Sequence, residues 1–366
     1  MLLPFEPLLL PLDKSLVNMN KIIIPVTNAA TALGMFDVRI RQKDIYTNHA
    51  LRHIVTMESL YSTRIEGTQT TVDAVYEAGA DVEPRKVDKD TNEVLKYSEA
   101  IYHGVSCINN GIPISNKLIK ELHSILLSGA GVRKNANFQP GVFRTQQNRV
   151  GEHIPPAAVE VENYMGNLEN YINCSNDAYD DSFPPLLKIA LIHAQFETIH
   201  PFPDGNGRVG RILIPLYLFK ESAISTPYFL ISQELERNRT RYYQFLQGTR
   251  TKTEDGITQW ICFFLDCIEK QAKKDVKFID SMNQLYLSTD EKLKEKINSS
   301  KTEQIVTAMF RAPVFTISKL AQLTNINPNT LRPYIKSLVK DNILFSDQTS
   351  RNTKYCFADL IDLIRQ

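Results

Sequence analysis

The stretch His200-Pro-Phe-Pro-Asp-Gly-Asn-Gly-Arg-Val-Gly-Arg211 combines an imidazole, a carboxylate, a glycine-rich turn and two arginines in one short segment. Its two prolines and two glycines before Arg208 exclude a continuous helix across residues 200–207, whereas the apolar residues that follow resume helical spacing. We therefore predict a loop that opens a helix. The first backbone N–H groups of such a helix lack intrahelical partners and lie at the positive end of its dipole, a geometry that binds phosphate.

Five residues of this stretch suit phosphate binding. The backbone N–H groups of Gly205, Asn206 and Gly207 would point out of the helix start toward an anion. Arg208 and Arg211 are three residues apart and would add donors from one helix face. Each residue alone also suits a turn or a solvated charge, but the combination favours a phosphate site.

Two further residues supply chemistry rather than binding. Asp204 stands where a carboxylate can hold Mg²⁺ against phosphate oxygens. His200 has a side chain that is close to neutral at the pH of the cell, which makes it the candidate general base.

The stretch matches the pattern H-x-F-x-[D/E]-G-N-G-R-x-x-R at every fixed position, so the chain resembles Fic domains. Residues 140–144 resemble the family's G-x-F-R segment, and residues 150–156 resemble the hairpin, or flap, that lines its target-binding groove. Through the flap, Val150, Gly151 and His153 are expected at the site. The resemblance covers about residues 110–250 and implies a mainly α fold, a helical bundle with a small β-hairpin flap.

The resemblance implies a protein adenylyltransferase, which moves AMP from ATP to a Ser, Thr or Tyr hydroxyl of a target protein or of itself. ATP would be the substrate and Mg²⁺ the cofactor, with His200 as base and Arg211 on the γ-phosphate. Three alternatives stay open: another nucleotide or phosphodiester donor, the reverse reaction as a deadenylylase, and a DNA-binding regulator that uses the fold as a sensor.

A second motif lies far upstream. Ser62-Thr-Arg-Ile-Glu66-Gly67 closes a helical pattern that runs from Ala29, and Gly67 suits a left-handed helix end. Ser62 and Glu66 are four residues apart and share a helix face. The segment resembles the inhibitory helix of many Fic proteins, which implies that Glu66 pairs with Arg211 and occupies the place of the γ-phosphate.

Tyr242 and Tyr243 resemble the residues that flank adenine in some Fic enzymes, although half-buried packing is the alternative interpretation. The pair His49 and His53 lacks a third metal ligand and is interpreted as structural. The other histidines that lie on predicted helices are also expected to be structural: His103, His123 and His193.

Composition excludes several classes of protein. Forty-two basic and forty-one acidic residues leave a net charge of +1, so no global field favours nucleic acid or membrane. Five cysteines without a C-x-x-C pair fit reduced thiols, and no apolar run is long enough for a membrane span. The leucine- and proline-rich beginning lacks a basic leader, so we expect a cytoplasmic protein.

The expected organisation has four parts. They are an N-terminal helical region (1–108) with the inhibitory helix at about 49–66, the Fic core (109–250), a helical extension or linker (251–298, with a boundary at 298–300), and a winged helix-turn-helix (299–366).

The last part holds nine Lys or Arg against five Asp or Glu, a net of +4, with Arg332 and Lys336 on one side of its candidate recognition helix. The winged fold serves DNA or protein partners, and both interpretations stay open. We also expect that the protein can form a dimer, but no particular residue indicates it.

Overall fold

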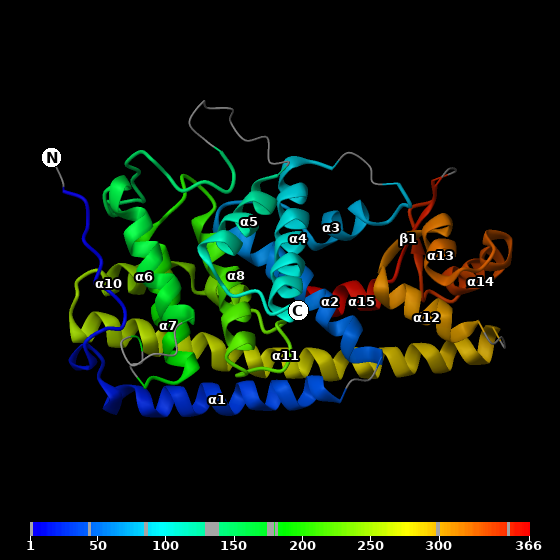
Figure 1. The fold of residues 1–366 in the computed structure, drawn as a ribbon. Coiled ribbons are helices and arrows are strands. Elements are labelled where there is room, and N and C mark those ends of the chain that lie inside the picture. The colour runs from blue at the N-terminus through cyan, green and yellow to red at the C-terminus, as the bar shows by residue number, and fades with distance from the viewer. Residues whose placement is uncertain are drawn as a thin grey trace.

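The protein is described here by a computed structural model, which covers residues 3–42, 45–83, 87–128, 139–173, 179, 182–297, 301–349 and 352–366. It is predominantly helical, as predicted (Figure 1). The predicted boundary at 298–300 lies outside the described residues, as do residues 129–138, which precede the predicted flap. None of the described helices combines the length and the apolar composition needed to cross a membrane.

The N-terminal region contains four helices in the described part of the chain. They are α1 (Met19–Arg41), α2 (Ile45–Ile65), α3 (Val72–Ala78) and α4 (Lys89–Asn109), preceded by a 3₁₀ turn, η1 (Lys14–Leu16). The predicted helical pattern from Ala29 is confirmed, but α1 begins ten residues earlier, at Met19, where the Asn18 side chain accepts from Lys21 N–H. Pro25 lies inside α1, a position that proline normally disfavours.

The central bundle lies beside α2 and α4 in Figure 1. It comprises α5 (Asn116–Leu127), η2 (Ala158–Glu160), α6 (Val161–Asn173), α7 (Pro185–Ile199), α8 (Asn206–Lys220), α9 (Ser232–Arg237) and α10 (Arg239–Thr249). Ser115 caps α5 by accepting from Leu118 N–H. Helices α7 and α8 are almost entirely buried, so the loop between them is held by two rigid core helices.

One helix, α11 (Glu254–Ile297), runs along the base of the molecule next to α1 (Figure 1). The sequence predicted a helical extension or linker here. The helix is more than a linker, because Trp260 and several later apolar residues are buried in the common core. Trp260 Nε1 also donates to the carbonyl of Ala190 in α7 at 2.8 Å, which ties α11 to the bundle.

The C-terminal part combines four described helices with a small sheet, and its interpretation as a winged helix stays a prediction. Helices α12 (Thr302–Arg311), α13 (Ile317–Thr324) and α14 (Pro328–Lys340) accompany strands β1 (Val314–Thr316), β2 (Phe345–Ser346) and β3 (Lys354–Cys356), and α15 (Ala358–Arg365) closes the chain. The strands form an antiparallel sheet in the order β1-β3-β2, with Val314 opposite Cys356 and Phe345 opposite the same residue. Leu331, Ile335 and Leu338 are buried, whereas Arg332 and Lys336 of α14 are exposed.

The C-terminal part is bonded to the segment that follows α2. Arg365 donates to both carboxylate oxygens of Asp73 at 2.6 and 2.7 Å, and Thr316 N–H donates to the carbonyl of Ala80 at 2.9 Å. His53 of α2 bonds the Tyr76 hydroxyl and the carbonyl of Phe310 through its two ring nitrogens. His53 is therefore a structural residue, as predicted.

Candidate active site

The loop between α7 and α8 takes the predicted loop-to-helix form. His200 ends α7 in the left-handed conformation, with φ 49° and ψ 62°, and its N–H donates to the carbonyl of Phe196 at 2.9 Å. Gly205 has φ 79° and ψ 5° at the start of α8, a conformation that side chains other than glycine rarely adopt. No side chain of the described residues caps α8, so its first N–H groups are open to an anion.

Aromatic and amide side chains fix the conformation of this loop. Asn206 accepts from Phe202 N–H and donates to the Phe202 carbonyl, both at 2.8 Å. Phe202 stacks on the ring of His123 with centroids 3.8 Å apart. Nδ1 of His123 accepts from Gly141 N–H, so Nε2 carries the proton and donates to the carbonyl of Asp204 at 3.0 Å. His123 thus has a structural role, and the Asn206 side chain is already bonded before any phosphate arrives.

His200 is held by a buried arginine. Arg144 donates from Nε to the carbonyl of His200 at 2.9 Å, and its N–H groups also reach the carbonyl of Pro156. Burial, and then the charge of Arg250, lower the pKa of His200 to about 3. The imidazole is therefore neutral at neutral pH, and Nδ1 has no hydrogen-bond partner among the described residues. A neutral imidazole keeps one unprotonated ring nitrogen, which can accept a proton.

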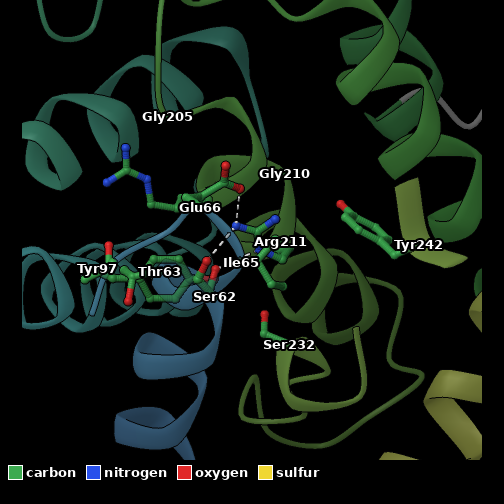
Figure 2. A network of polar contacts seen from close by, with 12 residues as sticks. Ser62, Thr63, Ile65, Glu66, Tyr97, Gly205, Gly210, Arg211, Ser232 and Tyr242 are labelled. Atoms are coloured by element: carbon green, nitrogen blue, oxygen red, sulfur yellow. Dashed lines mark hydrogen bonds and ion pairs between the residues drawn. The ribbon is translucent and has the colours of Figure 1, made fainter. Parts of the chain in front are cut away.

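Arg211 binds the two residues of the upstream motif (Figure 2). Nε of Arg211 donates to Ser62 Oγ at 2.8 Å, and a terminal N–H group donates to Glu66 Oε1 at 2.7 Å and to the Ser62 carbonyl at 2.9 Å. The arginine side chain is 1% exposed and that of Glu66 is 35% exposed. Gly67, with φ 101°, ends the motif just beyond α2.

The Glu66 carboxylate lies against the N-terminus of α8. A Cβ atom built on Gly207 would collide with Glu66 Oε1 and would lie 2.9 Å from a terminal nitrogen of Arg211. The carboxylate therefore already occupies the positive end of the helix, where an anion is stabilised. Gly207 is needed for this close approach.

Arg208 and Asp204 form the outer edge of the site. Arg208 is buried and lies 3.5 Å from Glu93 Oε2 and 3.5 Å from Asp204 Oδ1. The side chain of Asp204 is 70% exposed, and the same Oδ1 accepts from Gly205 N–H at 2.6 Å. A single exposed carboxylate beside a phosphate cradle fits Mg²⁺, which takes one or two carboxylates and completes its shell with phosphate oxygens and water.

Family models match two consecutive regions of the chain. The Fic/DOC family matches residues 113–218, and the Fic/DOC family N-terminal region matches residues 24–106. The chain belongs to the Fic/DOC family. The first match contains the whole His200–Arg211 loop, and the second contains Ser62 and Glu66.

Curated relatives carry a more specific name. "Protein adenylyltransferase Fic" of Drosophila willistoni is 30% identical over 213 residues, and that of Aedes aegypti is 29% identical over 234 residues. These matches cover 57% and 63% of this chain but only 39% and 41% of the relatives. The chain therefore matches less than half the length of these relatives.

Solved structures share the fold. A Fic family protein from Desulfovibrio desulfuricans is 19% identical with a TM-score of 0.56, and the match covers 98% of both chains. Residues 134–508 of Fic-1 from C. elegans are 20% identical with a TM-score of 0.52, covering 72% of this chain and 74% of that one. At these identities the likeness concerns the fold, which is the helical Fic fold that the sequence predicted.

The flap of this Fic protein is a tight turn. Val150 and His153 form an isolated antiparallel bridge, with N–H to carbonyl distances of 2.9 and 3.0 Å, and Gly151 has φ 59°. No longer ladder extends from this bridge within the described residues. His153 is 4% exposed, and its Nε2 bonds the carbonyl of Thr198 at 2.9 Å. The His153 ring thus anchors the turn to the end of α7.

The two tyrosines of α10 have different environments. Tyr242 is 1% exposed, and its hydroxyl bonds Nε2 of His193 at 2.9 Å inside an aromatic cluster with Trp260. Its ring cannot stack on a base, so the prediction for Tyr242 is corrected to a packing role. Tyr243 is 44% exposed, with its hydroxyl 3.5 Å from the carbonyl of Ile65, and stays a predicted nucleotide contact. Figure 2 shows Tyr242 on the far side of Arg211 from Ser62.

Two residues near the site were not predicted. Glu197 is buried one turn before His200, and burial raises its pKa to about 7. Arg250 reaches the carbonyl of Glu197 at 3.3 Å from the end of α10. A glutamate in the last turn of a helix that is buried along most of its length was a signal that could have been used. Arg250 carries no such signal, because its place depends on how α10 packs.

Proposed function

We propose that this Fic protein transfers AMP from ATP to a Ser, Thr or Tyr hydroxyl of a protein target. The observation that carries the proposal is the neutral His200 imidazole together with the α8 N-terminus, whose first N–H groups have no side-chain cap among the described residues. The name of the curated relatives, protein adenylyltransferase, supports the same reaction. The test is incubation with α-labelled ATP, because AMP transfer leaves this label on protein whereas phosphoryl transfer from the γ-position does not.

In the proposed reaction His200 takes the proton from the target hydroxyl. The hydroxyl oxygen then forms a bond to the α-phosphorus, and the bond between this phosphorus and the bridging oxygen of pyrophosphate breaks. The electron pair of the broken bond leaves with pyrophosphate. A base that is neutral before the reaction can accept this proton, and positioned general bases contribute about 10²–10⁴-fold in rate.

Phosphate oxygens would be held by the first N–H groups of α8 and by the Arg208 and Arg211 guanidinium groups. Asn206 would contribute through its backbone N–H, because its side chain is engaged with Phe202. Asp204 would hold Mg²⁺, which neutralises phosphate charge when bound.

Regulation by Glu66 forms part of the proposal. Its carboxylate bonds Arg211 and lies at the α8 N-terminus, where the γ-phosphate of a productive ATP would lie. Two anions cannot share this position without strong repulsion. Only a movement of Glu66 away from Arg211 would then allow ATP to bind in the productive orientation.

The flap turn at Val150–His153 would align the target segment. Strand addition uses main-chain hydrogen bonds, so such alignment is loosely selective for sequence. The target protein itself would then be selected by contacts outside the flap.

A pH profile tests the role of His200 as the base. Positive groups near His200, namely Arg250, His153 when protonated and Arg144, add to burial in lowering its pKa. Arg250→Met removes one of these charges, so the imidazolium is less disfavoured and the pKa rises. We expect the acid limb of the kcat/KM profile to move to higher pH in Arg250→Met. An unchanged acid limb, with the variant folded, would count against His200 as the group that must be unprotonated.

Other reactions of the same site have separate tests. Competition of labelling by UTP, GTP and CDP-choline distinguishes ATP from other donors, since a phosphate cradle does not read the base. Release of AMP from a previously modified target would indicate a deadenylylase in which Glu66 orients the attacking water. Labelling that only ATP suppresses supports the adenylyltransferase.

The C-terminal part favours a second function, DNA binding, through the exposed Arg332 and Lys336 of α14. If both side chains contact phosphate, the DNA affinity of Arg332→Ala/Lys336→Ala should depend less on salt. In a gel-shift titration, the plot of the logarithm of the binding constant against the logarithm of the salt concentration should be shallower by about 2. Lys270→Ala/Lys273→Ala on the exposed face of α11 is the matched control and should leave the slope unchanged. Equal slopes for the wild type, the α14 variant and the α11 control would contradict DNA binding by α14 and favour a protein partner for this helix.

A further inference from the structure

Three potential metal ligands meet between α4 and α5, apart from the nucleotide site. They are His103 and Cys107, four residues apart on α4, and Glu121 on α5. His103 Nε2 lies 3.1 Å from Glu121 Oε2 and 3.6 Å from Cys107 Sγ, and all three donor atoms lie within 4.8 Å of one another. Imidazole, thiolate and carboxylate are the three side-chain ligand types that zinc uses.

These separations fit the edges of one coordination tetrahedron. With bonds of about 2.3 Å to sulfur and about 2.0–2.2 Å to nitrogen and oxygen, the sulfur–nitrogen edge is about 3.6 Å and the nitrogen–oxygen edge about 3.4 Å. The observed separations are 3.6 Å and 3.1 Å. A cation could therefore enter with shifts of a few tenths of an ångström at the exposed ends of two side chains.

Exposure favours entry of an ion. The side chains of His103 and Glu121 are 36% and 42% exposed, so solvent reaches two of the three ligands. Cys107 is 7% exposed and lies at the inner end of the group. Such a site leaves a fourth position for water, whereas structural zinc sites usually close all four positions with protein ligands.

We propose that His103, Cys107 and Glu121 bind a borderline-soft divalent cation such as Zn²⁺, with water as the fourth ligand. The alternative is an ordinary ion pair between His103 and Glu121 beside an unrelated thiol. The pair His49 and His53 on α2 has the same four-residue spacing. His53, however, already bonds Tyr76 and Phe310, and no third ligand groups with this pair among the described residues. The α4–α5 group has the third ligand that the α2 pair lacks.

The ion would replace the thiol proton. A cysteine binds a metal ion as the thiolate, so a Cys107 thiol must lose its proton when the ion binds. Binding forms a metal–sulfur bond and releases this proton to solvent. Mg²⁺ prefers oxygen ligands, so the proposed ion differs from the one expected at Asp204.

The ion would join α4 to α5, the helix that also carries His123. Glu121 lies two residues before His123, whose Nε2 holds the carbonyl of Asp204. A bound ion would therefore restrain the helix that supports the loop. Because it binds the folded state, it should also raise the temperature of unfolding.

Cobalt titration of the full chain tests the site. Co²⁺ with a thiolate ligand gives a sulfur-to-metal charge-transfer band in the near ultraviolet. This absorbance is measured independently of the labelling activity of the protein. We expect one equivalent of Co²⁺ to produce this band in the wild type and Zn²⁺ to abolish it. Cys107→Ser should lack the band, and Cys262→Ser, which changes a thiol outside the group, should keep it.

Glu121→Gln keeps the thiol and the size of the side chain and covers the case in which Cys107→Ser fails to fold. We expect Glu121→Gln to weaken Co²⁺ binding at least about tenfold. Mutation of residues that only support a metal ligand already lowers metal affinity by about 10–100-fold. Absence of the band in wild type, its persistence in Cys107→Ser, or unchanged affinity in Glu121→Gln would each overturn the proposal.

Discussion

Glu66→Gly is expected to increase the incorporation of label from α-labelled ATP at least about tenfold over the wild type. The ion pair between Glu66 and Arg211 keeps the arginine from the γ-phosphate, and a difference of about 1.4 kcal/mol in the balance between the two states suffices for this factor. Glycine removes the carboxylate and also suits the end of α2, where Gly67 already turns the chain. The measurement is the initial rate of labelling with saturating target protein.

Two further variants separate the charge of Glu66 from its position. Glu66→Gln keeps the size of the side chain and a hydrogen bond to Arg211, so its activation should be smaller than that of glycine. Ser62→Ala removes one bond but leaves the Ser62 carbonyl and Glu66 on Arg211, so it should activate less than Glu66→Gly. A Glu66→Gly protein that is folded, binds ATP and labels no faster than the wild type would remove Glu66 from its regulatory role.

The second large effect concerns the base. In the Glu66→Gly background, His200→Ala should lower the labelling rate by about 10²–10⁴-fold, the usual contribution of a positioned base. Nucleotide affinity should change little, because the proposed phosphate donors are on α8 and none of them is the His200 ring. Rate and ATP affinity are measured on the same preparations. A variant that labels at the rate of its parent would exclude His200 as the base.

The part of the site that is contiguous in sequence could be predicted well. The prolines and glycines of residues 200–207 dictate a loop, and the apolar spacing after Arg211 dictates the helix, so local rules place the open N–H groups. The contact of Arg211 with Ser62 and Glu66 is different. Spacing placed the last two on one helix face, but only the family resemblance indicated that this face meets Arg211.

The residues that were mistaken or missed depend on packing over long separations. The side chain of Asn206 bonds the backbone of Phe202, so only the backbone N–H of this residue stays a predicted phosphate contact. Tyr242 and Tyr243 are adjacent in sequence but face opposite environments on α10, a difference set by the burial of Tyr242 against His193. Arg144 meets the His200 carbonyl from a segment 56 residues earlier, a contact that no local pattern predicts.

The start of α1 shows a limit of local rules. Pro25 normally disfavours a helix interior, because it lacks an N–H group and crowds the preceding turn. The helix nevertheless continues through it, since Ile22, Ala29 and Leu33 are buried in the core, with α11 alongside. Tertiary burial outweighs the local cost here.

The most direct test of the account is mass spectrometry of proteins modified by the Glu66→Gly form. This form and the Glu66→Gly/His200→Ala double variant are each incubated with ATP, Mg²⁺ and a lysate, and peptides are searched for the mass of one added AMP. The account predicts AMP on Ser, Thr or Tyr side chains with the single variant and its loss with the double variant. No AMP-bearing peptide in either sample, or equal modification in both, would contradict it.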